Sequence, residues 1–174
     1  MSDEAWFPRL VTPSAQALYL HLPFCARKCS YCDFASWPTR SADPLMPTYR
    51  DALLSQLSEA ESLGLLDSVG TAYIGGGTPT LLGEGLAPLV SHAVSLGVSE
   101  LTCEANPDSL SDATLAALVR EGATRLSIGV QSLDDRELGL LGRVHDAACA
   151  VDRVGAAVAS GLDVSCDLMC ATPG

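Results

Sequence analysis

Three cysteines near the start of the chain constrain this sequence more than any other feature. Cys25, Cys29 and Cys32 are spaced C-x3-C-x2-C within the stretch LYLHLPFCARKCSYCDF. Residues 18–22 have the pattern of a short buried strand, and Pro23 then removes a backbone donor, so regular pairing should stop there. The spacing therefore predicts three thiols in a loop just past the carboxyl end of a strand, where βα-barrels carry their chemistry.

Three thiolates at this spacing favour an iron–sulfur cluster. They can hold three irons of a cubic [4Fe–4S] cluster and leave the fourth iron open, and an open metal position is where a small molecule binds and reacts. The same thiols could instead form a structural zinc site, although zinc usually takes four ligands in paired knuckles, and His21 would reach back poorly from its strand. They could also form a disulfide or stay unligated, and an intracellular chain disfavours the disulfide.

The net charge of the chain, −11, is distributed unevenly along the sequence. Residues 1–50 hold five basic and four acidic side chains, whereas residues 51–174 hold five basic and 17 acidic ones. Nucleic-acid binding depends on Lys and Arg that neutralise phosphates, so this balance predicts no nucleic-acid partner. We interpret the acidic excess as a solvated shell that keeps the protein soluble.

Compartment and membrane association are also predicted from the sequence. The sequence has no run of about 18 apolar residues, so it predicts no membrane span, and association with a membrane is not indicated in this chain. The start, MSDEAWFPR, is acidic where a secretion signal would be basic, and the seven cysteines form no regular framework of pairs. These features predict a cytoplasmic protein.

Strands and helices alternate along the rest of the chain, which predicts an α/β fold with right-handed βαβ units and a parallel sheet. A proline-rich connection over residues 35–47 precedes the first helix, which should begin at about residue 48. The five expected strands are 18–22, 68–74, 100–104, 125–130 and 162–167. The further expected helices are 86–96, 112–121, 134–141 and 146–160.

The cysteine motif, with an aromatic residue (Tyr31) before its last cysteine, resembles the signature of radical S-adenosylmethionine (SAM) proteins. The surrounding YLHLPFC and CSYCDF resemble the branch that contains the heme chaperone HemW and oxygen-independent coproporphyrinogen III oxidase. This resemblance implies a partial (β/α) barrel of six βα units with about five present here, so the chain resembles an N-terminal half. We accordingly expect a lead-in over residues 1–16 and a radical SAM core over 17–174, incomplete at its C-terminus, with an open sheet edge.

The resemblance also implies which residues bind the cofactors. Cys25, Cys29 and Cys32 would hold the [4Fe–4S] cluster. The sequence GGGTPT at residues 75–80 is not a P-loop and could be a plain βα turn, but beside the cysteine loop it resembles a SAM-binding motif. The residues expected to bind SAM are Tyr19, Tyr31, Gly76, Gly77, Thr78, Glu104, Gln131, Arg143 and Asp167.

Several further residues have less specific interpretations. His145 resembles the histidine of a family Arg-x-His motif, but it could equally orient a neighbour, cap a helix or ligate heme. His92 is expected at the surface, and residues 106–108 are expected to form a structural turn. Cys103 and Cys166 alternate within strands and are expected to be small core residues.

The resemblance implies two activities. In the oxidase, reductive cleavage of SAM gives a 5′-deoxyadenosyl radical that starts decarboxylation of a porphyrinogen propionate; in HemW the protein binds heme and transfers it to an acceptor protein. The oxidase branch carries a further cysteine two residues after the third cluster cysteine, where this chain has Phe34. An aromatic ring cannot replace a thiol, so we favour the heme chaperone, with an electron donor as a further partner. The oxidase activity and an inactive, truncated fragment stay open at this point.

Overall fold

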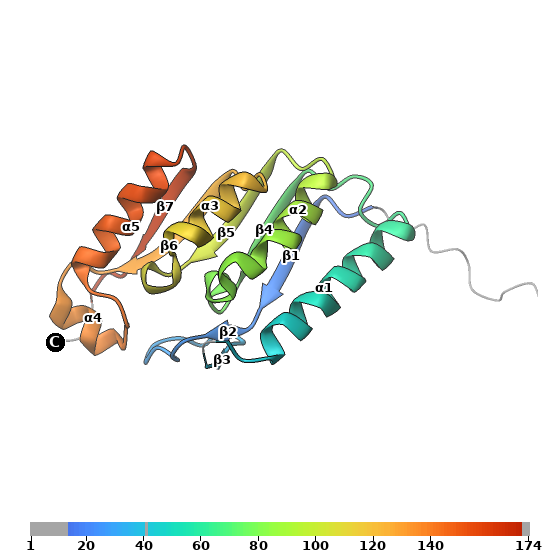
Figure 1. The fold of residues 1–174 in the computed structure, drawn as a ribbon. Helices are drawn as coiled ribbons and strands as arrows, with labels where there is room; N and C mark the ends of the chain where they lie inside the picture. Colours follow the sequence, from blue (N-terminus) through green and yellow to red (C-terminus); the bar gives the residue numbers. More distant parts are fainter. Residues whose placement is uncertain (1–13, 41, 172–174) are drawn as a thin grey trace, which may run out of the picture.

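The computed structural model describes residues 14–40 and 42–171, which form an α/β unit (Figure 1). The predicted lead-in lies largely outside the described residues. No helix among those residues is long and apolar enough to cross a membrane. The elements in chain order are β1 (Ala17–Leu22), β2 (Phe24–Cys25), β3 (Trp37–Pro38), α1 (Leu45–Ser62), β4 (Thr71–Gly76), η1 (Pro79–Leu86), α2 (Ala87–Ser95), β5 (Glu100–Ala105), η2 (Pro107–Ser109), α3 (Asp112–Arg120), β6 (Arg125–Gln131), α4 (Asp135–Leu141), α5 (Ala147–Ala159) and β7 (Asp163–Leu168).

The five predicted strands form one sheet in the order β1-β4-β5-β6-β7, and every neighbouring pair is parallel. Each crossover carries a helix, and α1, α2, α3 and α5 all cover the same face of the sheet (Figure 1). The order follows the chain without a reversal, as it does in a βα-barrel. The structure therefore confirms the expected fold class, an open, partial barrel.

The two faces of the sheet differ in the chemistry of their side chains. Side chains such as Leu22, Ile74 and Leu126 point toward the helices and are fully buried. The alternate positions point to the opposite face and are polar, among them Tyr19, Tyr73, Thr102, Glu104, Arg125, Ser127 and Ser165. Parallel sheets are normally covered on both faces. Here the helices cover one face (Figure 1), and the other carries polar side chains, of which Thr102 and Ser127 are buried.

Helix α1 begins earlier than predicted, at Leu45 instead of residue 48. The prediction treated the prolines at positions 44 and 47 as part of a connection. Pro44 is in fact the N-cap, and Pro47 lies in the first turn, where a missing N–H costs no helical hydrogen bond. The first turn can therefore include Pro47, and the connection after the cysteines is shorter than expected.

Strand β7 lies at one edge of the described sheet, and this position makes one prediction wrong. Cys166 is exposed and is not a core residue. Cys166 shares the face of Val164 and Leu168, which is the face toward the helices, but Leu168 is also 62% exposed. Sequence alternation correctly gives the face of Cys166, whereas burial also requires a neighbouring element that covers it. Cys103, in the central strand β5, is fully buried as predicted.

Candidate functional site

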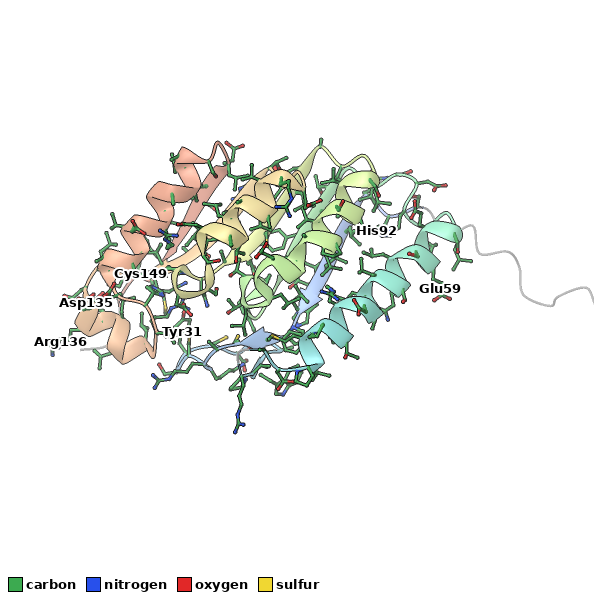
Figure 2. All side chains as sticks on the ribbon, in the orientation of Figure 1. Tyr31, Glu59, His92, Asp135, Arg136 and Cys149 are labelled. Atoms are coloured by element: carbon green, nitrogen blue, oxygen red, sulfur yellow. The ribbon has the colours of Figure 1, made fainter. Side chains whose placement is uncertain are left out.

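A cavity of about 260 Å³ lies at the carboxyl ends of the strands and contains most of the predicted site. Figure 2 shows one of its lining residues, Tyr31, at the end of the sheet toward which the strand arrows point. The two predicted residues that do not line it are Tyr19 and Gly76. The predicted residues that line it are Cys25, Cys29, Cys32, Tyr31, Gly77, Thr78, Glu104, Gln131, Arg143 and Asp167. Segments spread over almost the whole sequence therefore meet at one place.

The cysteine loop is held against two parts of the fold. Its start continues from β1 into β2, which pairs with β3 in a second, two-stranded sheet that the sequence did not predict. Lys28 Nζ donates to the Phe34 carbonyl at 2.6 Å, and the Ser30 N–H donates to the Leu141 carbonyl at the end of α4 at 3.2 Å. Cys25 is buried in β2, while Cys29 and Cys32 in the loop that follows are partly exposed.

The glycine-rich segment after β4 packs directly on the cysteine loop. The N–H groups of Gly77 and Thr78 donate to the carbonyls of Leu22 and Phe24 at 2.8 and 2.6 Å. A Cβ atom on Gly77 would lie 2.5 Å from the Phe24 oxygen and 2.9 Å from Cys25 Sγ, so only glycine allows this approach. The segment is thus more than a tight turn, because its backbone forms one wall beside the first thiol.

Glu104 is held at the end of β5 by two hydrogen bonds. Tyr73 Oη donates to Glu104 Oε1 at 2.8 Å, and the Gly76 N–H donates to Oε2 at 2.9 Å. Partial burial raises the pKa of the Tyr73 phenol, and its hydrogen bond to the carboxylate raises it further. Tyr73 therefore remains a donor at neutral pH. Tyr19 stacks on Tyr73 at a centroid distance of 5.9 Å, so this predicted residue lies next to the Glu104 network and outside the cavity lining.

Arg143 joins the cysteine loop to the ends of β5 and β6. Its Nη2 donates to Asn106 Oδ1 and to the Gly129 carbonyl, both at 2.7 Å, and its Nη1 donates to Cys29 Sγ at 3.5 Å. Arg143 is therefore part of the cavity wall and is not a free cation on the protein surface. Asn106, which the sequence indicated only as a turn residue, lines the same cavity. The signal for Asn106 was its position directly after a strand end.

The histidines outside the cavity have structural positions. The His145 side chain is fully buried, with Nε2 3.1 Å from the Val130 carbonyl and Nδ1 3.7 Å from Asp108 Oδ1. It holds the end of β6 next to η2, so heme ligation by His145 is contradicted by its burial, and an orienting role remains. His92 is only 18% exposed and lies 3.3 Å from Glu61 of α1, which corrects its assignment to the surface.

The donor set of the cavity fits an iron–sulfur cluster with a small polar ligand. Three thiols line one side of the cavity, and the backbone at Gly77, which leaves no room for a Cβ atom, lies against Cys25. No three His, Cys, Asp or Glu side chains in the described residues lie close enough to hold one metal ion. A cubic cluster places each thiolate on a different iron, so its ligands stand farther apart than those of a single ion. Arg143 Nε is buried without a hydrogen-bond partner in the described parts of the chain, which leaves a donor for a ligand.

Comparison with known families decides what this site belongs to. The model of the radical SAM superfamily matches residues 19–174, which is nearly the whole chain. The chain belongs to the radical SAM superfamily. The heme chaperone HemW of Mycobacterium tuberculosis is 38% identical over 164 residues, and that of Escherichia coli is 37% identical over 165. The bovine mitochondrial "radical S-adenosyl methionine domain-containing protein 1" is 39% identical over 163 residues.

A solved structure supports the same place within the superfamily. The radical SAM enzyme HemN, the coproporphyrinogen III oxidase of Escherichia coli, aligns with 90% of this chain at a TM-score of 0.73 and 26% identity. This radical SAM chain is therefore of the HemW/HemN-like kind. The alignments cover 90% of this chain but only 36% of the bovine protein, 42% and 43% of the two chaperones and 37% of HemN. The chain thus spans well under half the length of the relatives that it matches.

Proposed function

We propose that this chain is the cofactor-binding part of a HemW-like heme chaperone that carries one [4Fe–4S] cluster and SAM. The observation that carries the proposal is the single cavity in which three thiols meet the side chains predicted to bind SAM. Cys25, Cys29 and Cys32 would hold the cluster, which supplies the electron for reductive cleavage of SAM when both are bound. Residues 17–174 would form the radical SAM core.

The charges around the cavity match the polar groups of SAM. Arg143 suits the carboxylate because of its charge, and its Nε, which has no hydrogen-bond partner among the described residues, is a donor available for it. Glu104 and Asp167 can accept hydrogen bonds from an amino group or from ribose hydroxyls. The backbone at Gly76, Gly77 and Thr78 would contact the amino end of the ligand, with Gln131, Tyr19 and Tyr31 as the remaining contacts.

Phe34 favours the chaperone over the oxidase. Its side chain is 66% exposed and lines the cavity next to the cluster loop, where the oxidase pattern has a fourth cysteine. A phenyl ring at the mouth offers an apolar surface to a planar ligand such as a porphyrin, whereas it offers neither a ligand atom nor a redox-active thiol. We therefore propose heme as the cargo, an acceptor protein that takes it, and a reductant protein that supplies electrons. Decarboxylation of a porphyrinogen is the second candidate, because HemN shares the fold.

We propose a cytoplasmic setting for this function. Seven cysteines are free in the described structure, and three of them form the proposed cluster site, which requires reduced thiols. The acidic composition offers little for nucleic-acid phosphates, so the partners are small molecules and proteins.

The experiment that tests the chaperone uses the reading frame that contains this chain, purified anaerobically and reconstituted with iron and sulfide. Heme titration should give stoichiometric binding, and incubation with SAM, a reductant and coproporphyrinogen III should give no decarboxylated product. Formation of that product would favour the oxidase instead. Matched samples of Phe34→Cys would show whether this position separates the two activities.

A second experiment tests the cluster and SAM directly. Reduction in the presence of SAM should release 5′-deoxyadenosine, and Cys29→Ala should abolish the release because one iron loses its ligand. Cys166→Ala is the control, since it changes an exposed thiol on β7 outside the cavity lining. Equal release from the Cys29 variant would remove the cluster from the mechanism.

A further inference from the structure

Asn106 links the two sides of the cavity through its side-chain amide. Asn106 Nδ2 donates to Thr78 Oγ1 at 2.9 Å, and Asn106 Oδ1 accepts from Arg143 Nη2 at 2.7 Å. Thr78 follows β4 and Arg143 follows α4, so one amide between them connects the ends of separate βα units. The amide nitrogen and the amide oxygen of Asn106 therefore each make a hydrogen bond within the cavity wall.

Both partners of this amide also contact a cluster cysteine. Thr78 Oγ1 lies 3.7 Å from Cys25 Sγ as a donor, and Arg143 Nη1 lies 3.5 Å from Cys29 Sγ. A threonine hydroxyl has one hydrogen, and because its oxygen accepts from Asn106 that hydrogen remains available for the sulfur. Asn106 therefore orients a donor toward each of two sulfurs without touching either.

The side chain is not needed for the local turn. The turn after β5 uses the backbone of Asn106: its carbonyl accepts from the N–H groups of Ser109 and Leu110, both at 3.1 Å, and its own N–H is 3.4 Å from Thr80 Oγ1. A residue with another side chain could make the same backbone bonds. The amide, by contrast, is directed entirely at Thr78 and Arg143.

We propose that Asn106 is a positioning residue that raises the reduction potential of the cluster by holding these two donors on the cysteine sulfurs. Hydrogen bonds to ligating sulfurs stabilise the more negative, reduced form of an iron–sulfur cluster. The inference rests on the proposed cluster site and adds a determinant of its potential. It assigns a role to a residue that neither holds the cluster nor reacts.

The test is an anaerobic redox titration of the reconstituted protein, with dithionite and mediators, followed by EPR. Asn106→Leu keeps the approximate volume and removes both amide contacts, and Thr78→Val removes the hydroxyl. Each substitution should shift the midpoint potential of the cluster to a more negative value. At a fixed solution potential, the ratio of reduced to oxidised cluster should then fall about fivefold for one net hydrogen bond lost. Thr78→Ser keeps the donor and should titrate like the wild type.

Matched variants separate this role from a general loss of packing. Thr114→Val makes the same change at an equally buried threonine on α3, whose hydroxyl contacts Ser111, and should leave the midpoint unchanged. The double variant of Asn106 and Thr78 should shift by less than the sum of the single shifts, because both act on the same sulfur.

Each result bears on one proposal. An unshifted midpoint in Asn106→Leu with normal iron content would overturn the inference and leave the cluster site intact. Fully additive shifts would also overturn it. If Asn106→Leu retains no cluster, the Thr78→Val and Thr78→Ser pair decides, and equal midpoints for these two would overturn it. Absence of a cluster from the wild type would instead reject the proposed function.

Discussion

Replacing Gly77 with alanine should disrupt the contact between the glycine segment and the cysteine loop. The backbone of Gly77 lies outside the left-handed region, so alanine meets no conformational barrier there. The added methyl carbon would instead lie 2.5 Å from the Phe24 oxygen and 2.9 Å from Cys25 Sγ. Non-bonded carbon contacts are optimal at about 3.5–4.0 Å, so one of the two segments must move by about 1 Å.

The magnitude follows from the cost of overpacking. An extra methylene in a well-packed region costs about 1–3 kcal/mol. For a chain of this size each kcal/mol lowers the melting temperature by about 2–4 °C, so the expected decrease is about 4–8 °C for a cost near 2 kcal/mol. The movement would also displace Cys25, and we therefore expect less iron bound per chain after reconstitution.

Thermal unfolding and iron analysis of the same preparations measure both effects. Gly155→Ala is the control, because it lies inside α5 with no heavy atom within 4 Å of the added carbon. Alanine there should stabilise the helix by about 0.5–1 kcal/mol. If Gly77→Ala melts at the wild-type temperature and binds as much iron, the close approach is not a constraint and the reasoning fails.

Three further predictions concern single hydrogen bonds and their pH dependence. Tyr73→Phe removes the donor to Glu104 and should weaken SAM binding about three- to tenfold in equilibrium titrations, since a net hydrogen bond contributes about 1 kcal/mol; unchanged affinity would show that this bond does not position Glu104. The pKa of Tyr73 is raised in the folded protein, so the stabilisation that its hydrogen bond gives the fold is complete below pH 10, the usual tyrosine value, and is lost as the pH rises further. In urea unfolding, the wild type should therefore lose stability relative to Tyr73→Phe only in strong alkali. Asp146→Ala removes the N-cap acceptor of the Cys149 N–H at 2.7 Å and should lower stability by about 1 kcal/mol, whereas Asp146→Asn should restore most of it.

The position of the cysteine loop and the sheet could be predicted because their signals are local. The spacing of the three cysteines and Pro23 places them in one loop, and the alternation of strands and helices determines a parallel sheet. Helix caps are local as well: Asp134 directly precedes α4, and its Oδ1 accepts from the Arg136 and Glu137 N–H groups.

The hydrogen-bond hub at Asn106 could not be predicted in the same way. Its partners are 28 and 37 residues distant in the sequence, and they meet only because the carboxyl ends of parallel strands share one edge of the sheet. The burial of His145 and the exposure of Cys166 have the same origin. The burial of each residue depends on which element lies next to it in space. The pattern of its neighbours along the chain does not contain that information.

The most direct test of the account is EPR of the anaerobically reconstituted and reduced protein, recorded before and after addition of SAM. A cluster with three thiolate ligands has one iron open to SAM, so the account predicts a reduced-cluster signal that changes when SAM is added and a matching loss of that change in Arg143→Ala. A signal that SAM leaves unaltered would contradict the central claim that three thiols here hold a cluster with a site for this ligand.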